Sequence, residues 1–140
     1  MSQLTHISPF FIVANLEASV SFYVDKLGFT VLHQGPEGDP YWAMIGRDHI
    51  AIMLKTITGE VRPVPNYTRH PWAAWDAYIS TDDPEGLFGE YRSRGVLFRK
   101  PLHINSDRLL GFELQDADGY VLFFGRPDSN EDHPFPPTHR

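Results

Sequence analysis

The chain has 140 residues, with 12 Lys and Arg against 18 Asp and Glu and a formal net charge of −6. Its length and its hydrophobic fraction of 41% favour one globular domain that folds without disulfides or a structural metal. The absence of cysteine excludes a thiolate zinc site and a cysteine nucleophile, and the acidic balance without a basic cluster argues against nucleic acid as a partner.

The first half of the chain is predicted to run strand, helix and then three strands. Phe10–Val13 has the composition of a short strand, and Asn15 after it is a good helix N-cap. The next residues have one apolar helical face, made by Leu16, Val20, Tyr23 and Leu27. Gly28 suits the left-handed residue that follows a helix. The three later strands are predicted at Phe29–His33, Tyr41–Ile45 and His49–Leu54.

The second half repeats this order at an offset of 68 residues. The offset aligns Asn15 with Asp83, Glu17 with Glu85 and Tyr23 with Tyr91. Pro84 follows at the first helical position, where its missing N–H costs nothing. The strands of this half are predicted at Trp75–Ile79, Val96–Arg99, Gly111–Gln115 and Tyr120–Phe124. The turns before the last strands, Gly46–Asp48 and Asp116–Gly119, correspond at an offset of 70.

The repeat predicts an α+β fold of two tandem βαβββ modules in a single domain. We place the domain at 1–126, with module one at 7–56, a connector at 57–73, module two at 74–126 and a mobile tail with several prolines at 127–140. One such module would leave a sheet face bare. The two modules can cover that face by forming a cupped, eight-stranded mixed sheet with the helices outside, and we expect function inside the cup.

Two segments resemble the vicinal oxygen chelate superfamily, which holds the glyoxalases, the extradiol dioxygenases and the fosfomycin- and bleomycin-resistance proteins. One is Asn15–Phe29, which reads Asn-Leu-Glu-Ala-Ser-x-x-Phe-Tyr-x-x-x-Leu-Gly-Phe; the other is Asp116–Phe124, which reads Asp-Ala-Asp-Gly-Tyr-Val-Leu-Phe-Phe. The resemblance covers about residues 7–126. It implies the two-module fold without settling the activity, because one fold hosts several chemistries.

Metal-binding relatives carry His, Gln or Glu ligands on the opening and closing strands of each module. The resemblance places these positions at Ser8, Met53, Asp76 and Phe123. Only Asp76 suits a hard divalent cation, so we expect no metal and no cofactor. The alternative is a divalent metal such as Zn, Ni, Mn or Fe, held by His6, His49 or Asp76.

The chain most resembles the metal-free bleomycin-resistance branch, because Pro9–Val13 is similar to the Pro-x-x-x-Val start of that branch's first strand. The members of that branch are acidic homodimers that sequester cationic, planar-ring drugs. Strand alternation and flanking aromatic residues then predict a ligand-binding set, since aromatic faces stack planar rings and attract cations. The set is Phe10, Ile12, Tyr41, Trp42, His49, Met53, Trp72, Trp75, Asp76, Tyr78 and Phe123. The alternative interpretation is that these aromatic residues serve the core or a dimer interface.

We therefore predict a non-catalytic protein, with no catalytic residue, that binds an aromatic or cationic small molecule in an acidic aromatic cleft. A bleomycin-type drug is the implied ligand, antibiotic resistance the implied role and a homodimer the implied assembly. The alternative function is a metal-dependent glyoxalase, isomerase or dioxygenase of the same superfamily. A third hypothesis is a relative with a structural or interaction role.

No apolar run approaches the roughly 18 residues of a transmembrane helix, so we expect no membrane partner. The first residues, Met1–His6, lack the charged and apolar regions of a signal peptide. We therefore expect a cytoplasmic location.

Overall fold

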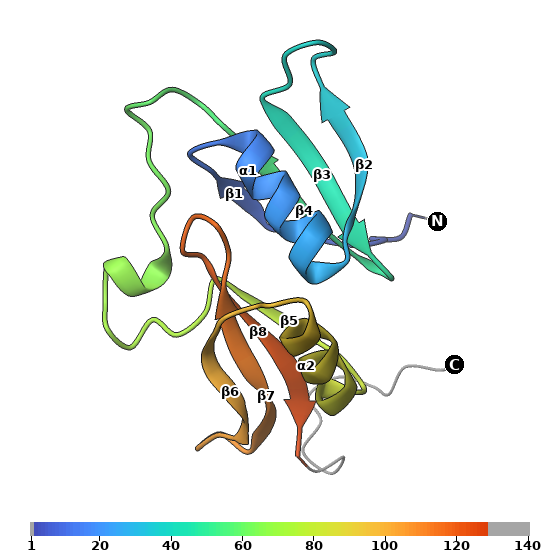
Figure 1. The fold of residues 1–140 in the computed structure, drawn as a ribbon, viewed down its shortest axis with the longest axis vertical. Helices are drawn as coiled ribbons and strands as arrows, with labels where there is room; N and C mark the ends of the chain where they lie inside the picture. Colours follow the sequence, from blue (N-terminus) through green and yellow to red (C-terminus); the bar gives the residue numbers. More distant parts are fainter. Residues whose placement is uncertain (1, 129–140) are drawn as a thin grey trace.

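The computed structural model describes residues 2–128, and Figure 1 shows two similar modules, one above the other. Each module runs strand, helix, strand, strand, strand, in the predicted order. Module one contains β1 (Phe10–Ile12), α1 (Leu16–Ser21), β2 (Thr30–Gly35), β3 (Trp42–Arg47) and β4 (Ile50–Lys55). Module two contains β5 (Ala77–Ser80), α2 (Pro84–Ser93), β6 (Phe98–Ile104), β7 (Leu109–Gln115) and β8 (Val121–Pro127). The connector holds one 3-10 turn at Asn66–Thr68, and the predicted tail beyond residue 128 lies outside the described residues.

The eight strands form two four-stranded mixed sheets, which confirms the α+β class and the tandem modules. Sheet A has the order β1-β4-β3-β2, and sheet B has the order β5-β8-β7-β6. In each sheet the opening strand pairs in parallel with the closing strand, and the other neighbours are antiparallel. The strand pairs of residues 2–128 all lie within one sheet or the other.

The helices begin at the predicted caps. The side chain of Asn15 accepts a hydrogen bond from Ala18 N, and that of Asp83 accepts one from Gly86 N, so each satisfies a donor that the helix leaves free. The first helix differs from the prediction of one regular α-helix. After α1 the chain continues as a π-helix over Phe22–Lys26, a widened turn that the 3.6-residue spacing of apolar side chains does not reveal.

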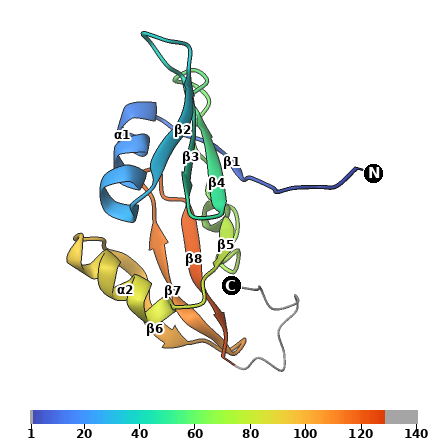
Figure 2. The ribbon, with the colours of Figure 1, turned by 90° about the vertical axis from the view of Figure 1, so that its right-hand side faces the viewer.

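The hydrophobic core lies between the helices and the two sheets. The strand residues that face the helices are buried or half-buried, and the fully buried ones include Phe11, Ile52, Leu54, Leu122 and Phe124. Figure 2 shows α1 and α2 on the same side of the sheets. We call the opposite side the bare face; its central row holds Phe10, Met53 and Met44 in sheet A, and Tyr78, Phe123 and Glu113 in sheet B.

A buried first junction ties the last turn of module two to the start of module one. Tyr23 Oη donates a hydrogen bond of 2.6 Å to Asp116 Oδ2, and the ring of Tyr120 stacks on Phe11 with 4.3 Å between centroids. Tyr120 Oη also donates to the carbonyl oxygen of Ile12 at 2.6 Å. These contacts hold β1 and the start of β8 in a fixed relation, and those strands carry part of the bare face in each sheet.

The helices of the described part, residues 2–128, are all too short or too polar to cross a lipid bilayer.

Candidate functional site

Three aromatic rings cluster on the bare face of sheet B. Trp75 precedes β5, Tyr78 lies on β5 and Phe123 lies beside Tyr78 on β8. Phe123 stacks with Trp75 at a centroid distance of 4.6 Å and with Tyr78 at 5.2 Å, and the Trp75 and Tyr78 rings are 5.6 Å apart. We call these three residues the aromatic triad. All three belong to the predicted ligand-binding set, and the structure brings them together.

The triad has a buried floor and an accessible rim. Phe123 is 2% exposed although it faces away from both helices, because Trp75 and Tyr78 cover it. Tyr78 is 39% exposed and presents its ring to solvent. Burial raises the pKa of Tyr78 above its ordinary value, so its phenol stays neutral at physiological pH. The triad therefore offers a rigid, uncharged aromatic surface.

A buried carboxylate fixes the triad at its edge. Glu113 lies next to Phe123 on β7, and its side chain is only 5% exposed. Trp75 Nε1 donates to Glu113 Oε2 at 2.9 Å, and Arg99 Nη1 donates to Glu113 Oε1. The guanidinium of Arg99 also lies over the ring of Tyr67, 6.0 Å from its centroid. Glu113 thus holds the indole of Trp75 in place and pairs with a cation beside it.

Sequence reasoning did not single out Glu113, Arg99 or Tyr67. Glu113 had a signal, because it is a single acid between apolar neighbours in a predicted strand. A carboxylate in that position is either solvent-facing or buried with partners, and only the fold shows that Arg99 and Trp75 supply them. Tyr67 lies in the connector, for which the sequence predicted no element.

Asp76 serves as an anchor for the connector. Its Oδ1 accepts from Asn66 N at 2.9 Å, and its Oδ2 accepts from Val121 N at 2.8 Å. Both oxygens therefore already bind backbone N–H groups of neighbouring segments. The predicted role of Asp76 as a ligand-binding acid stays a prediction.

The resemblance places metal-ligand positions at Ser8, Met53, Asp76 and Phe123, and the expected absence of a metal there stays a prediction. Phe123 offers no donor atom, and Met53 offers a thioether that hard divalent cations disfavour. The oxygens of Asp76 accept the two backbone bonds just described. Among residues 2–128, no three His, Asp or Glu side chains lie close enough together to hold an ion.

The central row of the bare face of sheet A is apolar, and its methionine side chains are flexible. Phe10 on β1 is 54% exposed and pairs with Met53 on β4, which in turn pairs with Met44 on β3. Ile12, two residues beyond Phe10, is half-buried. Met44 was not predicted, although its alternation with the buried Ala43 and Ile45 could have indicated it.

The remaining predicted residues lie at the margins. Tyr41 precedes β3, with the ammonium of Lys55 5.6 Å from its ring centroid, and Trp42 is the half-buried first residue of that strand. His49 is exposed in the turn between β3 and β4. Trp72 is 87% exposed in the connector, where its ring contacts His70. The structure does not gather these four side chains into the triad.

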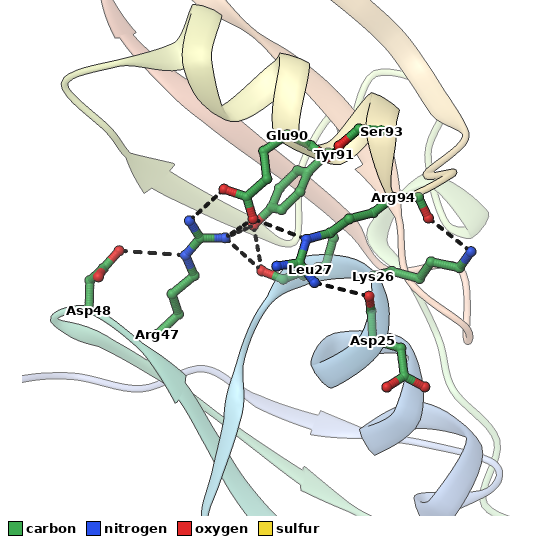
Figure 3. Close-up of polar contacts among 9 residues, drawn as sticks. All are labelled: Asp25, Lys26, Leu27, Arg47, Asp48, Glu90, Tyr91, Ser93 and Arg94. Carbon is green, nitrogen blue, oxygen red and sulfur yellow. Dashed lines mark hydrogen bonds and ion pairs between the residues drawn. The ribbon is translucent and has the colours of Figure 1, made fainter.

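A second junction between the modules borders an open groove of about 480 Å³ on the helix side. Figure 3 shows Arg47, at the end of β3, reaching Glu90 on α2 with two hydrogen bonds of 2.8 Å. Arg47 Nη1 also donates to the carbonyl oxygen of Leu27, and Arg94 Nε lies 3.2 Å from Glu90. The bond from Arg47 lowers the pKa of Glu90.

This groove is built as a joint between modules. Tyr91 Oη donates to the carbonyl oxygen of Leu27 at 2.9 Å, so Tyr91 joins the modules here as its repeat partner Tyr23 does at the first junction. The guanidinium of Arg47 directs its donors to Glu90 and Leu27. The side chains of Arg47 and Glu90 are therefore engaged in joining the modules.

The Glyoxalase/Bleomycin resistance protein/Dioxygenase superfamily model matches residues 3–124. The chain belongs to this superfamily. No curated protein matches the chain at a significant level.

Several solved structures share the fold at low sequence identity. A bleomycin-binding protein from bleomycin-producing Streptomyces verticillus, complexed with copper(II)-bleomycin, is 22% identical, with a TM-score of 0.64 over 89% of this chain and 97% of that one. TnmS3, an antibiotic binding protein from Streptomyces sp. CB03234, is 19% identical, with a TM-score of 0.64 over 90% and 99%. A glyoxalase-related enzyme from Clostridium phytofermentans is 11% identical, with a TM-score of 0.68 over 89% and 95%. The fold is thus shared with two binding proteins and with one glyoxalase-related enzyme.

Proposed function

We propose that this protein binds a planar aromatic small molecule on the aromatic triad and holds it without chemical conversion. The observation that carries the proposal is the stack of Trp75 and Tyr78 on the buried ring of Phe123, with Tyr78 open to solvent. Aromatic pairs of this kind contribute about 0.5–1.5 kcal/mol each beyond the area that they bury.

The triad is suited to binding because it is ordered before a ligand arrives. Glu113 fixes the Trp75 indole by a hydrogen bond, and Phe123 packs against both rim rings. A binding surface whose side chains are already immobilised loses less conformational entropy on association. More of the contact energy of the rings therefore appears as affinity for the ligand.

We further propose that the protein works as a homodimer in the cytoplasm, with a second copy enclosing the bare face. The exposed Phe10 and the methionines beside it form an apolar surface of the kind that interfaces bury. A cleft between two copies would surround a ligand that a single open sheet only touches on one side.

Bleomycin-type drugs are the first candidates for the ligand, which makes antibiotic resistance by sequestration the proposed role. The support is the fold shared with proteins described as bleomycin-binding and antibiotic binding. The net charge of −6 favours the approach of a cationic drug at long range, whereas recognition at the triad depends on the groups beside it.

Fluorescence of a single-tryptophan variant tests the proposal. The variant Trp42→Phe/Trp72→Phe retains Trp75 as its one indole, and titration with bleomycin should quench it saturably with the drug recovered unchanged by mass spectrometry. Protein treated with a chelator should give the same titration curve, because we propose no metal. Adding Tyr78→Ala should weaken binding, whereas adding Tyr41→Ala at the margin should not. The proposal would be contradicted if neither bleomycin nor any other planar aromatic compound quenched the Trp75 fluorescence.

A further inference from the structure

We propose that the site selects a planar aromatic ligand that carries a hydrogen-bond-accepting oxygen (a carbonyl, phenolate or carboxylate) at its ring edge, and that Arg99 is the residue that recognises this oxygen. This inference rests on the proposed function, since it concerns the ligand of the aromatic triad. It opposes the preference for a cation that the overall charge of the chain suggests.

The two carboxylates that border the triad are already engaged. Glu113 accepts from Arg99 with one oxygen and from Trp75 with the other, and its side chain is 5% exposed. Asp76 accepts a backbone N–H with each oxygen. A cationic ligand would find no unpaired carboxylate here, and it would have to compete with Arg99 for Glu113.

Arg99, in contrast to these two carboxylates, has donors that are not engaged. It uses Nη1 for Glu113, and within residues 2–128 its Nε and Nη2 have no hydrogen-bond partner. Its side chain is 28% exposed, so these N–H groups are within reach of a ligand. The guanidinium lies over the ring of Tyr67, 6.0 Å from its centroid. A guanidinium keeps its charge at every physiological pH and donates in a fixed plane, which suits an oxygen lying in the plane of an aromatic ring.

The distances allow one small molecule to touch both features. Tyr78, Phe123 and Glu113 lie on three successive strands in direct register. Neighbouring strands are spaced by about 4.8 Å, so the Tyr78 and Glu113 positions are about 10 Å apart. A fused two-ring system with one oxygen substituent spans that length, with its rings over Tyr78 and Trp75 and its oxygen toward Arg99.

Three probes with the same ring system test the inference: 2-naphthoate, 2-naphthylmethylammonium and the neutral 2-naphthalenemethanol. Each is titrated into the wild-type protein and followed by tryptophan fluorescence and calorimetry. We expect 2-naphthoate to bind at least about tenfold more tightly than 2-naphthylmethylammonium, because the carboxylate can accept a charge-assisted hydrogen bond from Arg99 whereas the ammonium has no acceptor.

The variant Arg99→Met/Glu113→Gln removes both charges of the buried pair and leaves an amide oxygen at position 113 as an acceptor for the Trp75 indole. It should lose the preference for 2-naphthoate and lose less affinity for 2-naphthalenemethanol, whose hydroxyl accepts a weaker hydrogen bond than a carboxylate does. The variant Arg99→Lys keeps the charge and the pairing with Glu113, so it should fold in any case and retain a weaker preference of the same sign.

The outcomes separate this inference from the proposed function. A wild-type preference for the ammonium probe, or equal affinities for the two charged probes, overturns the role of Arg99 and leaves binding of aromatic rings intact. The same holds if Arg99→Met/Glu113→Gln folds and still prefers 2-naphthoate. Failure of all three probes to bind overturns the inference, and failure of bleomycin as well contradicts the proposed function.

Discussion

Corresponding strands of the two modules carry different chemistry in the row that faces away from the helices. The repeat aligns Phe10 with Tyr78, Met53 with Phe123, and Met44 with Glu113. In sheet A this row is exposed or half-buried and flexible, because methionine has three rotatable bonds. In sheet B the corresponding row contains a buried ring and a buried carboxylate, which pairs with the partly exposed Arg99. Two copies of one topology thus carry an apolar surface in one sheet and an ordered aromatic surface in the other.

The junctions between the modules diverge in the same way. The turn of module two places Asp116 in the interior, where Tyr23 binds it, whereas the matching position of module one is Gly46, at the floor of an open groove. Here the second junction depends on the partly exposed pair of Arg47 and Glu90. The repeat therefore fixes where the modules touch, and the side chains decide whether the contact is buried.

Removing the floor of the triad should have the largest effect on stability. Phe123→Ala should lower the free energy of unfolding by about 3–5 kcal/mol, since the ring is fully buried and both rim rings rest on it. Met53→Ala, the matching change in sheet A, should lower it by about 1–2 kcal/mol because Met53 is only half-buried. Denaturation by guanidinium chloride measures both. Equal losses of unfolding free energy would contradict the difference in burial between the row of sheet B and the row of sheet A.

The buried carboxyl of the first junction should make stability depend on pH. Burial raises the pKa of Asp116 to about 6 from an ordinary value near 3.8, so the folded protein holds this proton more tightly than the unfolded chain. The resulting stabilisation is fully present below about pH 4 and is lost as the pH rises through 6. It amounts to on the order of 3 kcal/mol.

The variant Asp116→Asn isolates this contribution. The difference in unfolding free energy between the wild type and the variant should change between pH 4 and pH 7, in favour of the wild type at the acid end. The variant Glu17→Gln, an exposed acid on α1, serves as the matched control. A difference between wild type and Asp116→Asn that is constant across this range would exclude the buried carboxyl as the source.

Glu113→Ala should destabilise the protein by about 2–3 kcal/mol. The change leaves the Arg99 cation and the Trp75 N–H without their acceptor in a largely buried place. Glu113→Gln should be milder, because its amide oxygen still accepts one of the two donors. Thermal and chemical unfolding of both variants measure these losses. If Glu113 were an ordinary surface charge, both variants would lose no more than about 0.5 kcal/mol of unfolding free energy.

The smallest expected effect is that of Trp75→Phe. The phenyl ring keeps most of the stacking on Phe123 but loses the hydrogen bond to Glu113, which should lower the unfolding free energy by about 1 kcal/mol. Trp72→Phe at the exposed connector position should change it by less than about 0.5 kcal/mol. Similar losses in the two variants would contradict the anchoring of Trp75.

The repeat and the alternation of the strands were enough to predict the fold and part of the site. Helix caps at Asn15 and Asp83 set the order of elements, and period-two burial assigned Phe123 and Tyr78 to the side away from the helices. These local patterns could not predict which side chains meet when they lie far apart in the sequence. Glu113 meets Arg99 across a strand pair whose register shifts, and Tyr67 comes to Arg99 from a connector that Asp76 anchors.

The most direct test of ligand binding at the aromatic triad is the indole N–H spectrum of protein labelled with ¹⁵N-tryptophan, recorded during titration with 2-naphthoate. The three tryptophans give three signals, of which Trp75 belongs to the triad and Trp72 lies exposed in the connector. We predict a saturable shift of the Trp75 signal with the Trp72 signal unchanged. A shift confined to Trp42 or Trp72, with Trp75 unmoved at saturation, would contradict binding at the triad.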